Sequence, residues 1–301
     1  MNILCACNKN YIDKTQTMLV SLRKCVKEEI VVYFMNDKLT DEEIRLFRKY
    51  LKKHRIKLNV IDASHLFVGK DVYTGRWGVE MYFRVFAQFL LPEDIDRILW
   101  LDGDIIVKKD ITDFYYQPFE EYYVVCRDMS WDFDFVQDLK HSLGLPDDHV
   151  YFNSGVLLIN LKALRIGTDI NTIFNTIDNL KEKFLFPDQD LLNCLYCGHV
   201  NYADENCNFM KMENNIENAR IIHYAWKKPW ESDKPEQNHK YRWQARLSEG
   251  YVSEWWKNWM SPKINRKLRT VKSKVFLFSR KVFIKIFGGK AYDKFKKLFR
   301  H

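Results

Sequence analysis

The feature that most constrains the fold is the regular alternation of short apolar runs with longer amphipathic segments through the first 200 residues. This rhythm is typical of βαβ units, in which helices cover both faces of a sheet. Apolar runs without polar alternation indicate strands buried on both faces, as in parallel sheets. We therefore expect an α/β fold with a doubly wound, mostly parallel sheet, whose strands span residues 3–7, 30–35, 56–61, 97–101, 122–126 and 156–161.

Local signals place helices between these strands. Residues 11–25 and 79–91 are expected to be helical, and Thr40 with Glu43 forms a capping box that opens a helix to about residue 53. Pro187 precedes an acidic stretch and predicts the start of another helix. The first 200 residues are therefore expected to form one domain.

The charge of the chain is concentrated near its end. The net charge is +8, but residues 263–301 carry 14 basic residues and one acidic residue, so this segment is +13 and the rest is −5. A nucleic-acid-binding function for the whole protein therefore does not follow from its net charge. Phenylalanines interleaved with the basic residues favour a basic helical tail that binds an anionic membrane surface. A solvated basic arm, or one packed on the body, is the alternative.

The chain divides by composition into three regions. Residues 1–232 form the predicted domain, residues 233–262 form a Trp-rich extension, and residues 263–301 form the basic tail. No apolar run approaches the roughly 18 residues that cross a bilayer, and the chain starts without a secretory signal pattern. Seven cysteines, an odd number, fit a reducing compartment. We expect a cytoplasmic protein, peripheral on the inner face of the cell membrane, in which Cys194 and Cys197 are ordinary core residues instead of a redox or zinc pair.

Several nucleotide-binding and hydrolytic motifs are absent from the sequence. The 11 glycines include no G-x-G, so neither the dinucleotide fingerprint nor the P-loop is present. G-x-S-x-G and H-E-x-x-H are also missing, which disfavours serine hydrolases and zincins. An α/β domain without these loops can bind a nucleotide diphosphate through a metal ion, so acidic residues at strand ends become the groups of interest.

Asp102 and Asp104 are the strongest candidates for such a site. They follow the apolar run 97–101 directly, at the sheet edge where open α/β folds bind ligands. Both carboxylates of a D-x-D turn can reach one divalent ion, and their hard oxygen atoms suit Mn²⁺ or Mg²⁺. The sequence holds four D-x-D pairs, of which only this one directly follows a strand-like run. A turn whose carboxylates only face water is the alternative.

Three further segments carry polar residues at positions suited to a site. Asn153 precedes an apolar run, where its amide can bind a sugar hydroxyl or only shape a turn. Asp188 and Gln189 lie at the start of a predicted helix, where capping explains one acidic residue but hardly the whole group. His223 follows an apolar pair and precedes two lysines that suit phosphate oxygens, although a lone histidine is more often a satisfied core residue.

In combination, these segments resemble the retaining glycosyltransferases of family 8 over about residues 1–232. The family includes bacterial lipopolysaccharide α-galactosyl- and α-glucosyltransferases and the glycogenins. The resemblance implies a single GT-A-like nucleotide-sugar-binding domain, with Mn²⁺ or Mg²⁺ held by Asp102, Asp104 and His223. It also implies that the donor nucleotide contacts Asn8, Asn10, Arg84 and Lys228, and that the transferred sugar is surrounded by Asp128, Asn153, Asp188 and Gln189.

The chain departs from the family pattern at three places. Asn8 stands where a family member often has aspartate, and Trp226 stands where it has glycine. The lysine spacing after His223 is one residue short, which leaves the phosphate contact open between Lys227 and Lys228.

The implied reaction moves galactose or glucose from UDP-galactose or UDP-glucose to an oligosaccharide, lipid-linked or protein-linked glycan acceptor, with the anomeric configuration kept. The implied catalytic residues are Gln189, Asp188 and Asp128. Gln189 is a neutral amide and a poor nucleophile, so same-face substitution is favoured over a covalent glycosyl-enzyme. A sugar-phosphate nucleotidyltransferase and a non-catalytic carbohydrate- or nucleic-acid-binding protein are the alternatives, although no nucleic-acid partner is expected.

Overall fold

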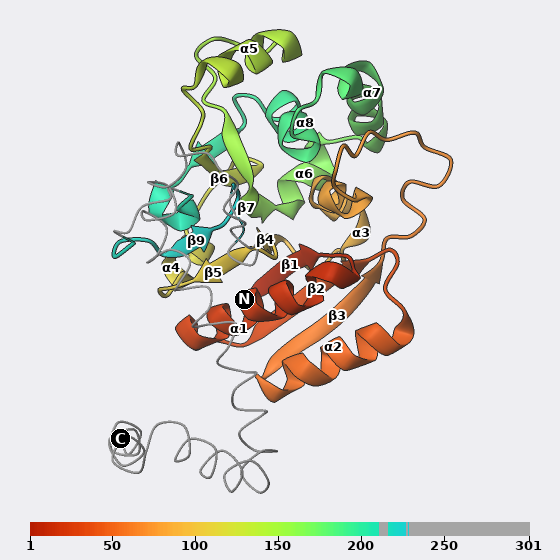
Figure 1. Ribbon diagram of the computed structural model, residues 1–301, viewed down its shortest axis with the longest axis vertical. Coiled ribbons are helices and arrows are strands. Elements are labelled where there is room, and N and C mark those ends of the chain that lie inside the picture. The colour runs from red at the N-terminus through yellow and green to blue at the C-terminus, as the bar shows by residue number, and fades with distance from the viewer. Residues whose placement is uncertain (211–215, 227, 229–301) are drawn as a thin grey trace, which may run out of the picture. The chain divides into compact units, whose positions relative to one another are not determined.

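The computed structural model describes residues 1–210, 216–226 and 228. Within them, seven strands form one sheet in the order β3-β2-β1-β4-β7-β6-β8 (Figure 1). β1 to β4 run parallel, β8 runs parallel to β6, and β7 runs antiparallel to both of its neighbours. The predicted α/β class with a mostly parallel sheet is confirmed. The strands of this sheet are β1 (Asn2–Ala6), β2 (Ile30–Asn36), β3 (Ile56–Asp62), β4 (Arg97–Leu101), β6 (Tyr123–Arg127), β7 (Phe152–Asn160) and β8 (Val200–Tyr202).

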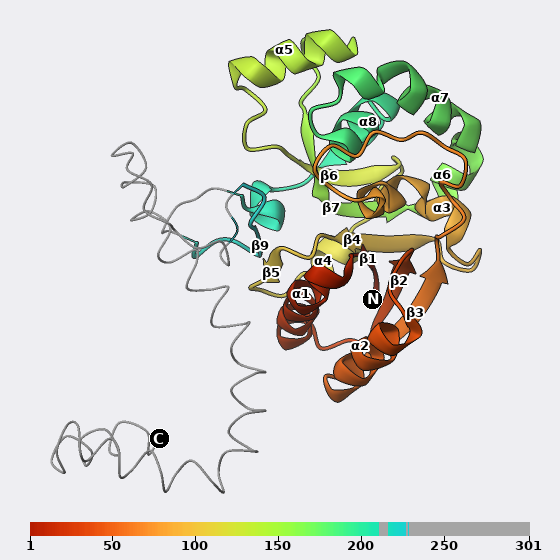
Figure 2. The same cartoon turned by 45° about the vertical axis from the view of Figure 1, so that its right-hand side comes forward.

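Helices cover both faces of the sheet (Figures 1 and 2). α1 and α2 lie on one face, and α3, α6, α7 and α8 lie on the other. The α-helices are α1 (Ile12–Cys25), α2 (Asp41–Lys53), α3 (Ala87–Leu90), α4 (Thr112–Tyr116), α5 (Asp134–Leu143), α6 (Leu161–Gly167), α7 (Ile170–Leu180) and α8 (Pro187–Leu195). The 3₁₀ helices are η1 (Lys9–Tyr11), η2 (Val79–Phe86), η3 (Lys181–Lys183) and η4 (Glu205–Asn208).

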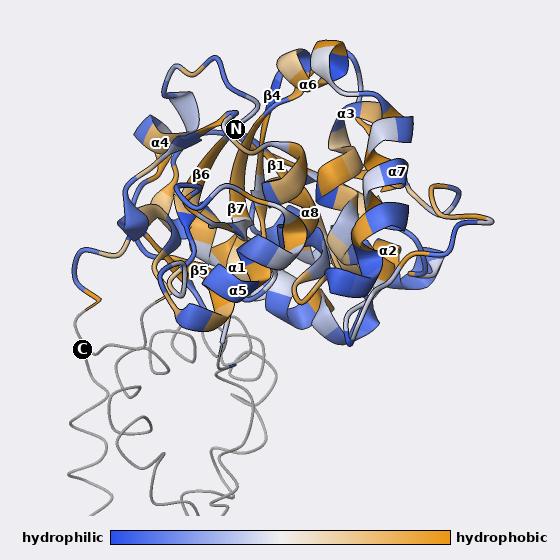
Figure 3. Ribbon diagram, turned by 90° about the horizontal axis from the view of Figure 1, so that it is seen from above, coloured by the Kyte–Doolittle hydropathy of each residue, from blue (hydrophilic) through white to orange (hydrophobic). Residues whose placement is uncertain are grey.

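The strands are buried on both faces, so their side chains alternate between two apolar cores. In β1, Ile3 and Cys5 join the core beneath α1 and α2, whereas Leu4 joins the core beneath η2 and α8. Figure 3 shows the apolar strands in the middle and the polar sides of the helices on the outside. This arrangement explains why the strands appear in the sequence as continuous apolar runs.

Local signals set several helix ends as predicted. In the capping box of α2, Glu43 N–H donates to Thr40 Oγ1 at 3.4 Å and Thr40 N–H donates to Glu43 Oε2 at 2.9 Å. Pro187 occupies the first turn of α8, where its missing N–H costs no helical hydrogen bond. Cys25 ends α1 and Lys53 ends α2, as expected.

The expected helix over residues 79–91 is wrong in type. Most of it is the 3₁₀ helix η2, and only α3 is α-helical. Arg84 supplies a local reason, because its Nε donates to the Met81 carbonyl at 2.9 Å. In an α-helix, that carbonyl would accept the N–H of Val85 instead.

The strand expected at 156–161 begins earlier than predicted, and the alternative of a turn at Asn153 is wrong. β7 begins at Phe152, so Asn153 and Ser154 lie inside the strand. Because β7 runs antiparallel to β4, with Val156 paired to Leu101, its amino end meets the carboxyl end of β4. This reversal brings Asn153 to the edge of the sheet where Asp102 lies.

Two short strands form a second sheet outside the main one. β5 (Ile105–Val107) pairs antiparallel with β9 (Ile221–His223), and Ile105 lies opposite His223. Neither strand was predicted from the sequence. Their pairing joins segments more than 100 residues apart and carries His223 to the end of β4.

Among the described residues, no helix is long and apolar enough to cross a bilayer. All seven cysteines are free. Burial raises the pKa of Cys194 to about 12, which disfavours the thiolate that a redox pair or zinc site needs. The predicted Trp-rich extension at 233–262 and the predicted basic tail at 263–301 lie outside the described residues.

Candidate functional site

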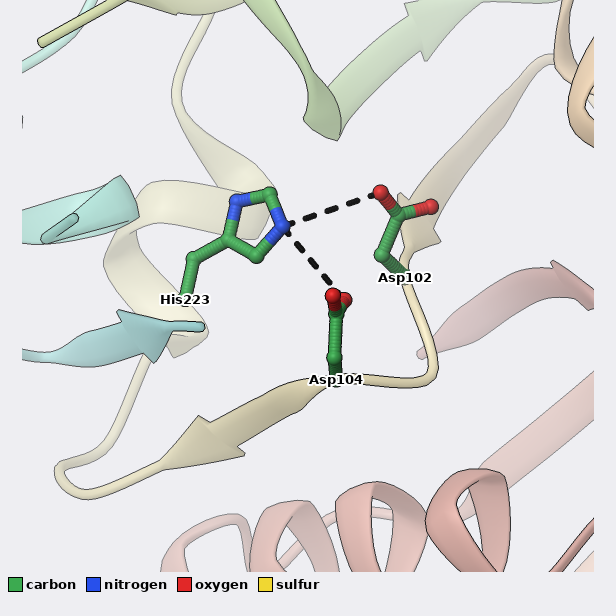
Figure 4. A group of neighbouring side chains, drawn as sticks. All are labelled: Asp102, Asp104 and His223. Carbon is green, nitrogen blue, oxygen red and sulfur yellow. Dashed lines mark ion pairs between the residues drawn. The ribbon is translucent and has the colours of Figure 1, made fainter. Parts of the chain in front are cut away.

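Asp102 and Asp104 occupy the turn between β4 and β5 (Figure 4). Asp102 N–H donates to the Gly155 carbonyl at 3.0 Å, which ties the turn to β7. Asp104 is 7% exposed, and its carbonyl accepts the N–H of Tyr224 at 3.0 Å. Both carboxylates therefore sit on backbone that is pinned to neighbouring strands, unlike those of a solvated turn.

His223 completes a cluster with these two acids. Its Nε2 lies 3.7 Å from Asp102 Oδ2 and 3.4 Å from Asp104 Oδ1, as the dashed lines in Figure 4 mark. One ligand atom from each of the three residues lies within 4.8 Å of the other two. The structure thus brings together the three residues that the family resemblance implied as metal ligands.

The imidazole of His223 packs directly against the backbone of β7. A Cβ atom at Gly155 would lie 2.2 Å from His223 Cε1 and 2.8 Å from Asp102 Oδ2. Such contacts are far inside van der Waals distance, so only glycine at 155 leaves room for the cluster.

The donor set fits a divalent ion. Adjacent ligands of an octahedral ion at about 2.1 Å are separated by about 3 Å, close to the two distances from His223 Nε2. Two carboxylates and one imidazole supply oxygen and nitrogen donors that suit ions such as Mn²⁺. Only small movements of the side chains are needed for all three to reach one ion.

Asp102 is oriented by an arginine and a tryptophan. Its Oδ1 lies 2.8 Å from Arg84 Nη2 in an ion pair and accepts a hydrogen bond from Trp100 Nε1 at 2.9 Å. The Arg84 guanidinium also lies over the Trp100 ring, 4.2 Å from its centroid. These contacts occupy Oδ1 and leave Oδ2 facing His223.

Lys228 lies on the other side of the cluster. Its Nζ donates to Asp104 Oδ2 and to the carbonyls of Tyr224 and Ala225, at 2.8 Å and 3.0 Å for the carbonyls. Burial by itself raises the pKa of Asp104, but the Lys228 ammonium and His223 outweigh burial and hold this pKa well below its ordinary value. Lys227 lies outside the described residues.

Arg84 also links the cluster to α8. Its Nε lies 3.3 Å from Asp188 Oδ2, and its Nη1 donates to the Ser154 carbonyl at 2.6 Å. Ser154 Oγ donates to the same oxygen of Asp188 at 2.8 Å. Burial raises the pKa of Asp188 although Arg84 lowers it. Arg84 thus holds Asp102 and Asp188 together, and its predicted contact with a donor stays a prediction.

A cluster of amide side chains lies beside the charged groups. Asn153 Nδ2 donates to Gln189 Oε1 at 2.9 Å and to Asp128 Oδ2 at 3.1 Å. Gln189 Oε1 also accepts Ser154 N–H at 3.2 Å, and its Nε2 donates to Asp128 Oδ2 at 3.2 Å. All of these side chains are less than 10% exposed. The structure therefore brings Asp128, Asn153 and Gln189 together, next to Asp188.

Asn8 and Asn10 lie at the end of β1. The Asn8 side chain accepts Asn10 N–H at 3.0 Å and caps η1, so it has a local structural role. Asn10 is exposed. Their predicted contacts with uridine stay predictions.

The sequence did not point to Trp100, Ser154 or Asn208, which all contact the site. Trp100 belongs to the apolar run of β4, and nothing in that run indicates that its Nε1 donates a hydrogen bond to Asp102. Asn208 Oδ1 lies 3.0 Å from His223 Nδ1, and its Nδ2 donates to Asn153 Oδ1 at 2.9 Å. The short segment Glu205–Asn208 carries no motif, so only the folded structure reveals this contact.

Comparison with known proteins decides the family. The model of glycosyl transferase family 8 matches residues 2–234, which is most of the chain. The chain belongs to glycosyltransferase family 8. The predicted resemblance is confirmed, and the family 8 match places the site described above inside a glycosyltransferase domain.

Relatives of this family 8 chain include enzymes of lipopolysaccharide synthesis. A lipopolysaccharide 1,2-glucosyltransferase from Escherichia coli is 26% identical over 252 residues, covering 76% of this chain and 73% of that protein. A lipopolysaccharide 1,3-galactosyltransferase from Salmonella typhimurium is 24% identical over 252 residues, covering 77% and 73%. The two relatives are named for different hexoses.

The fold is shared with solved glycosyltransferase structures. The crystal structure of the galactosyltransferase LgtC with donor and acceptor sugar analogues matches with a TM-score of 0.69 at 23% identity, covering 86% of this chain and all of that chain. The glycosyltransferase GlyE of Streptococcus pneumoniae matches with a TM-score of 0.56 at 22% identity, covering 87% of this chain and 64% of that chain. The expected GT-A-like fold is confirmed.

Proposed function

We propose that this family 8 glycosyltransferase moves galactose or glucose from a UDP-sugar to the sugar portion of a lipopolysaccharide-type acceptor, with retention of the anomeric configuration. The observation that carries the proposal is the convergence of Asp102, Asp104 and His223 at the carboxyl end of β4, beside the amide cluster. The named activities of the two lipopolysaccharide relatives support the hexose and the acceptor class.

Asp102, Asp104 and His223 would hold the divalent ion, and the favoured ion is Mn²⁺. Such an ion neutralises a diphosphate and makes it a better leaving group. Lys228 supports this role, because its ammonium lies on Asp104 at the edge of the cluster, where a phosphate oxygen can be reached as well. Arg84 positions Asp102 and Asp188 through their carboxylates.

The amide cluster would hold the transferred sugar. Gln189 Oε1 already accepts two hydrogen bonds, from Asn153 and Ser154, which makes it a still weaker nucleophile than a free amide. A covalent intermediate on Gln189 is therefore disfavoured, and substitution on the face of the departing diphosphate is the proposed route. The dipoles of Asn153 and Gln189 would then stabilise the charge that develops on the sugar.

A pocket beside the amide cluster suits the acceptor sugar. It combines two aromatic residues and two methionines with charged groups, a mixture that fits both the apolar face and the hydroxyls of a sugar. Arg127 lies over the ring of Trp131, 5.6 Å from its centroid, and pairs with Glu205 at 3.2 Å. The pocket is lined by Arg127, Met129, Trp131, Asp132, Glu205, Asn208, Phe209 and Met210.

The membrane association predicted for residues 263–301 remains part of the proposal and rests on the sequence alone. The charge of +13 favours anionic lipid. Binding to vesicles that contain anionic lipid, weakened by salt and lost on deletion of 263–301, is the expected result.

The direct test of the proposed function is a release assay with UDP-galactose and UDP-glucose in the presence of Mn²⁺. We expect slow UDP release with one donor, faster release when a lipopolysaccharide oligosaccharide is added, and an α-linked product by NMR. Consumption of UTP with a sugar phosphate would favour a nucleotidyltransferase instead. No turnover with any nucleotide sugar would contradict the proposal.

A further inference from the structure

Asn208 lies between the charged cluster and the amide cluster. It ends η4 and is 1% exposed. The backbone fixes its position, because Phe209 N–H donates to the Ile221 carbonyl at 2.8 Å and His223 N–H donates to the Phe209 carbonyl at 2.9 Å. The side chains of Asn208 and His223 thus extend from two segments that are bonded to each other.

The orientation of the Asn208 amide follows from a backbone donor. Gly155 N–H lies 2.9 Å from one side-chain atom of Asn153, and that atom must be the oxygen because the backbone N–H can only donate. The same oxygen lies 2.9 Å from Asn208, so the group facing it there must be the NH₂ of Asn208. The remaining atom of that amide, its oxygen, therefore faces His223 Nδ1.

This orientation determines the proton on the neutral imidazole. An amide oxygen can only accept, so Nδ1 of His223 carries the hydrogen, at 3.0 Å from Asn208 Oδ1. The lone pair is then on Nε2, the atom that faces Asp102 and Asp104. Groups that fix the second nitrogen of a ligating histidine commonly tune metal affinity.

We propose that Asn208 is a positioning residue with two functions: it holds His223 with Nε2 directed at the metal position, and it fixes Asn153 beside Gln189. The first function acts on metal binding, and the second acts on the sugar side of the site. The inference rests on the proposed function, since it assigns Asn208 a role toward the metal and the transferred sugar.

Two substitutions separate these functions. Asn208→Ala removes both hydrogen bonds. Asn208→Asp keeps an oxygen for His223 Nδ1–H but loses the donor to Asn153, whose oxygen would then face a carboxylate. Asn206→Ala, two residues earlier in η4, is the matched control, because Asn206 bonds to the other described residues through its backbone N–H and carbonyl and not through its side chain.

Mn²⁺ affinity in the presence of UDP, measured by electron paramagnetic resonance titration, is the first readout. We expect Asn208→Ala to weaken Mn²⁺ binding by roughly 10- to 100-fold, and Asn208→Asp and Asn206→Ala to stay within about threefold of the unsubstituted protein. Asn208→Asp should still lower kcat by about tenfold, because Asn153 is released. Unchanged affinity in Asn208→Ala, or equal weakening by both Asn208 variants, would overturn the proposal.

The ¹⁵N spectrum of the His223 ring is the second readout and needs no metal. At a pH where the ring is neutral, the unsubstituted protein should carry the proton on Nδ1, and Asn208→Ala should show a mixture of the two forms. A proton on Nε2 in the unsubstituted protein would overturn the proposal even if Asn208→Ala fails to fold. Absence of Mn²⁺ binding to the unsubstituted protein would instead count against the proposed function.

Discussion

The two halves of the site differ in how they are held together. In the charged half, two acids lie within reach of one imidazole nitrogen, and each acid also pairs with one cation, Asp102 with Arg84 and Asp104 with Lys228. In the amide half, Asn153 and Gln189 satisfy each other and Asp128 through fixed hydrogen bonds. We infer from this difference that the first half is built to bind a cation, whereas the side chains of the second half are already held in place by hydrogen bonds to one another.

The largest expected effect comes from breaking the charged half. Asp104→Ala should reduce Mn²⁺-dependent transfer about a thousandfold, because a metal-stabilised leaving group contributes several kcal/mol to the barrier. The thermal unfolding midpoint should stay similar, since the half-buried Lys228 then keeps its two carbonyl acceptors. UDP release measures the change, and Asp94→Ala, an exposed aspartate of another D-x-D pair, is the control. Full activity in Asp104→Ala would contradict the proposal that Asp104 is a metal ligand.

A smaller effect is expected from the amide half. Gln189→Ala should lower kcat about a hundredfold while Mn²⁺ affinity stays unchanged, because the side chain bonds to Asn153 and Asp128 and not to the metal cluster. Steady-state kinetics and a metal titration measure the two quantities. A glycosyl-enzyme seen by mass spectrometry in this variant would contradict same-face substitution. Weakened Mn²⁺ binding would show that the amide half also contributes to binding the metal ion.

Trp100→Phe is a milder change in the charged half, because it alters one hydrogen bond to Asp102. The substitution removes the Nε1–H that donates to Asp102 but keeps an aromatic ring beneath Arg84. We expect Mn²⁺ affinity to fall only a few-fold, in line with the loss of about 1 kcal/mol for one hydrogen bond. Trp77→Phe on the surface should change nothing. A loss of Mn²⁺ affinity as large as that found for Asp104→Ala in the same titration would show that Asp102 depends on Trp100 for its position.

The smallest effect on chemistry is expected at Asp190, which supports α8 beneath the amide half. It accepts the N–H groups of Leu185 and Phe186 at 2.6 Å and 2.8 Å, and burial raises its pKa from 3.8 to about 7. A carboxyl whose pKa is raised on folding stabilises the protein at low pH, and this contribution is lost as pH rises from about 4 through 7.

Asp190→Asn should therefore flatten the pH dependence of the unfolding free energy between pH 4 and 7. The asparagine oxygen can still accept the two N–H groups, so activity near neutral pH should remain within a few-fold. Chemical denaturation at several pH values provides the measurement, with the exposed Asp138→Asn as control. If the unfolding free energy depends on pH equally in Asp190→Asn and in the unsubstituted protein, Asp190 is not the group that titrates in this range.

The long strands and helices could be predicted because their burial leaves a clear pattern. β4 matches its expected range of 97–101, and the capping box at Thr40 opens α2. The direction of β7 could not be predicted, since an apolar run has the same appearance in a parallel and an antiparallel strand. β5 and β9 have three residues each, which is too short for any periodic signal.

The site residues that lie in sequence motifs could be predicted. Those that reach the site only through the pairing of distant strands could not. Asp102 and Asp104 follow a visible strand, and Asp188 with Gln189 opens a visible helix. His223 reaches Asp104 only through the pairing of β5 with β9, and its assignment needed the family resemblance. Asn208 lies in a single 3₁₀ turn, so its contacts with His223 and Asn153 exist only in the folded chain.

The most direct test of the central claim is an anomalous diffraction map from crystals of this protein grown with Mn²⁺ and UDP. The account predicts one strong manganese peak about 2.1 Å from an oxygen of Asp102, an oxygen of Asp104 and Nε2 of His223, with diphosphate oxygens on its open side. A manganese peak elsewhere, or UDP bound with His223 turned away from both acids, would contradict it.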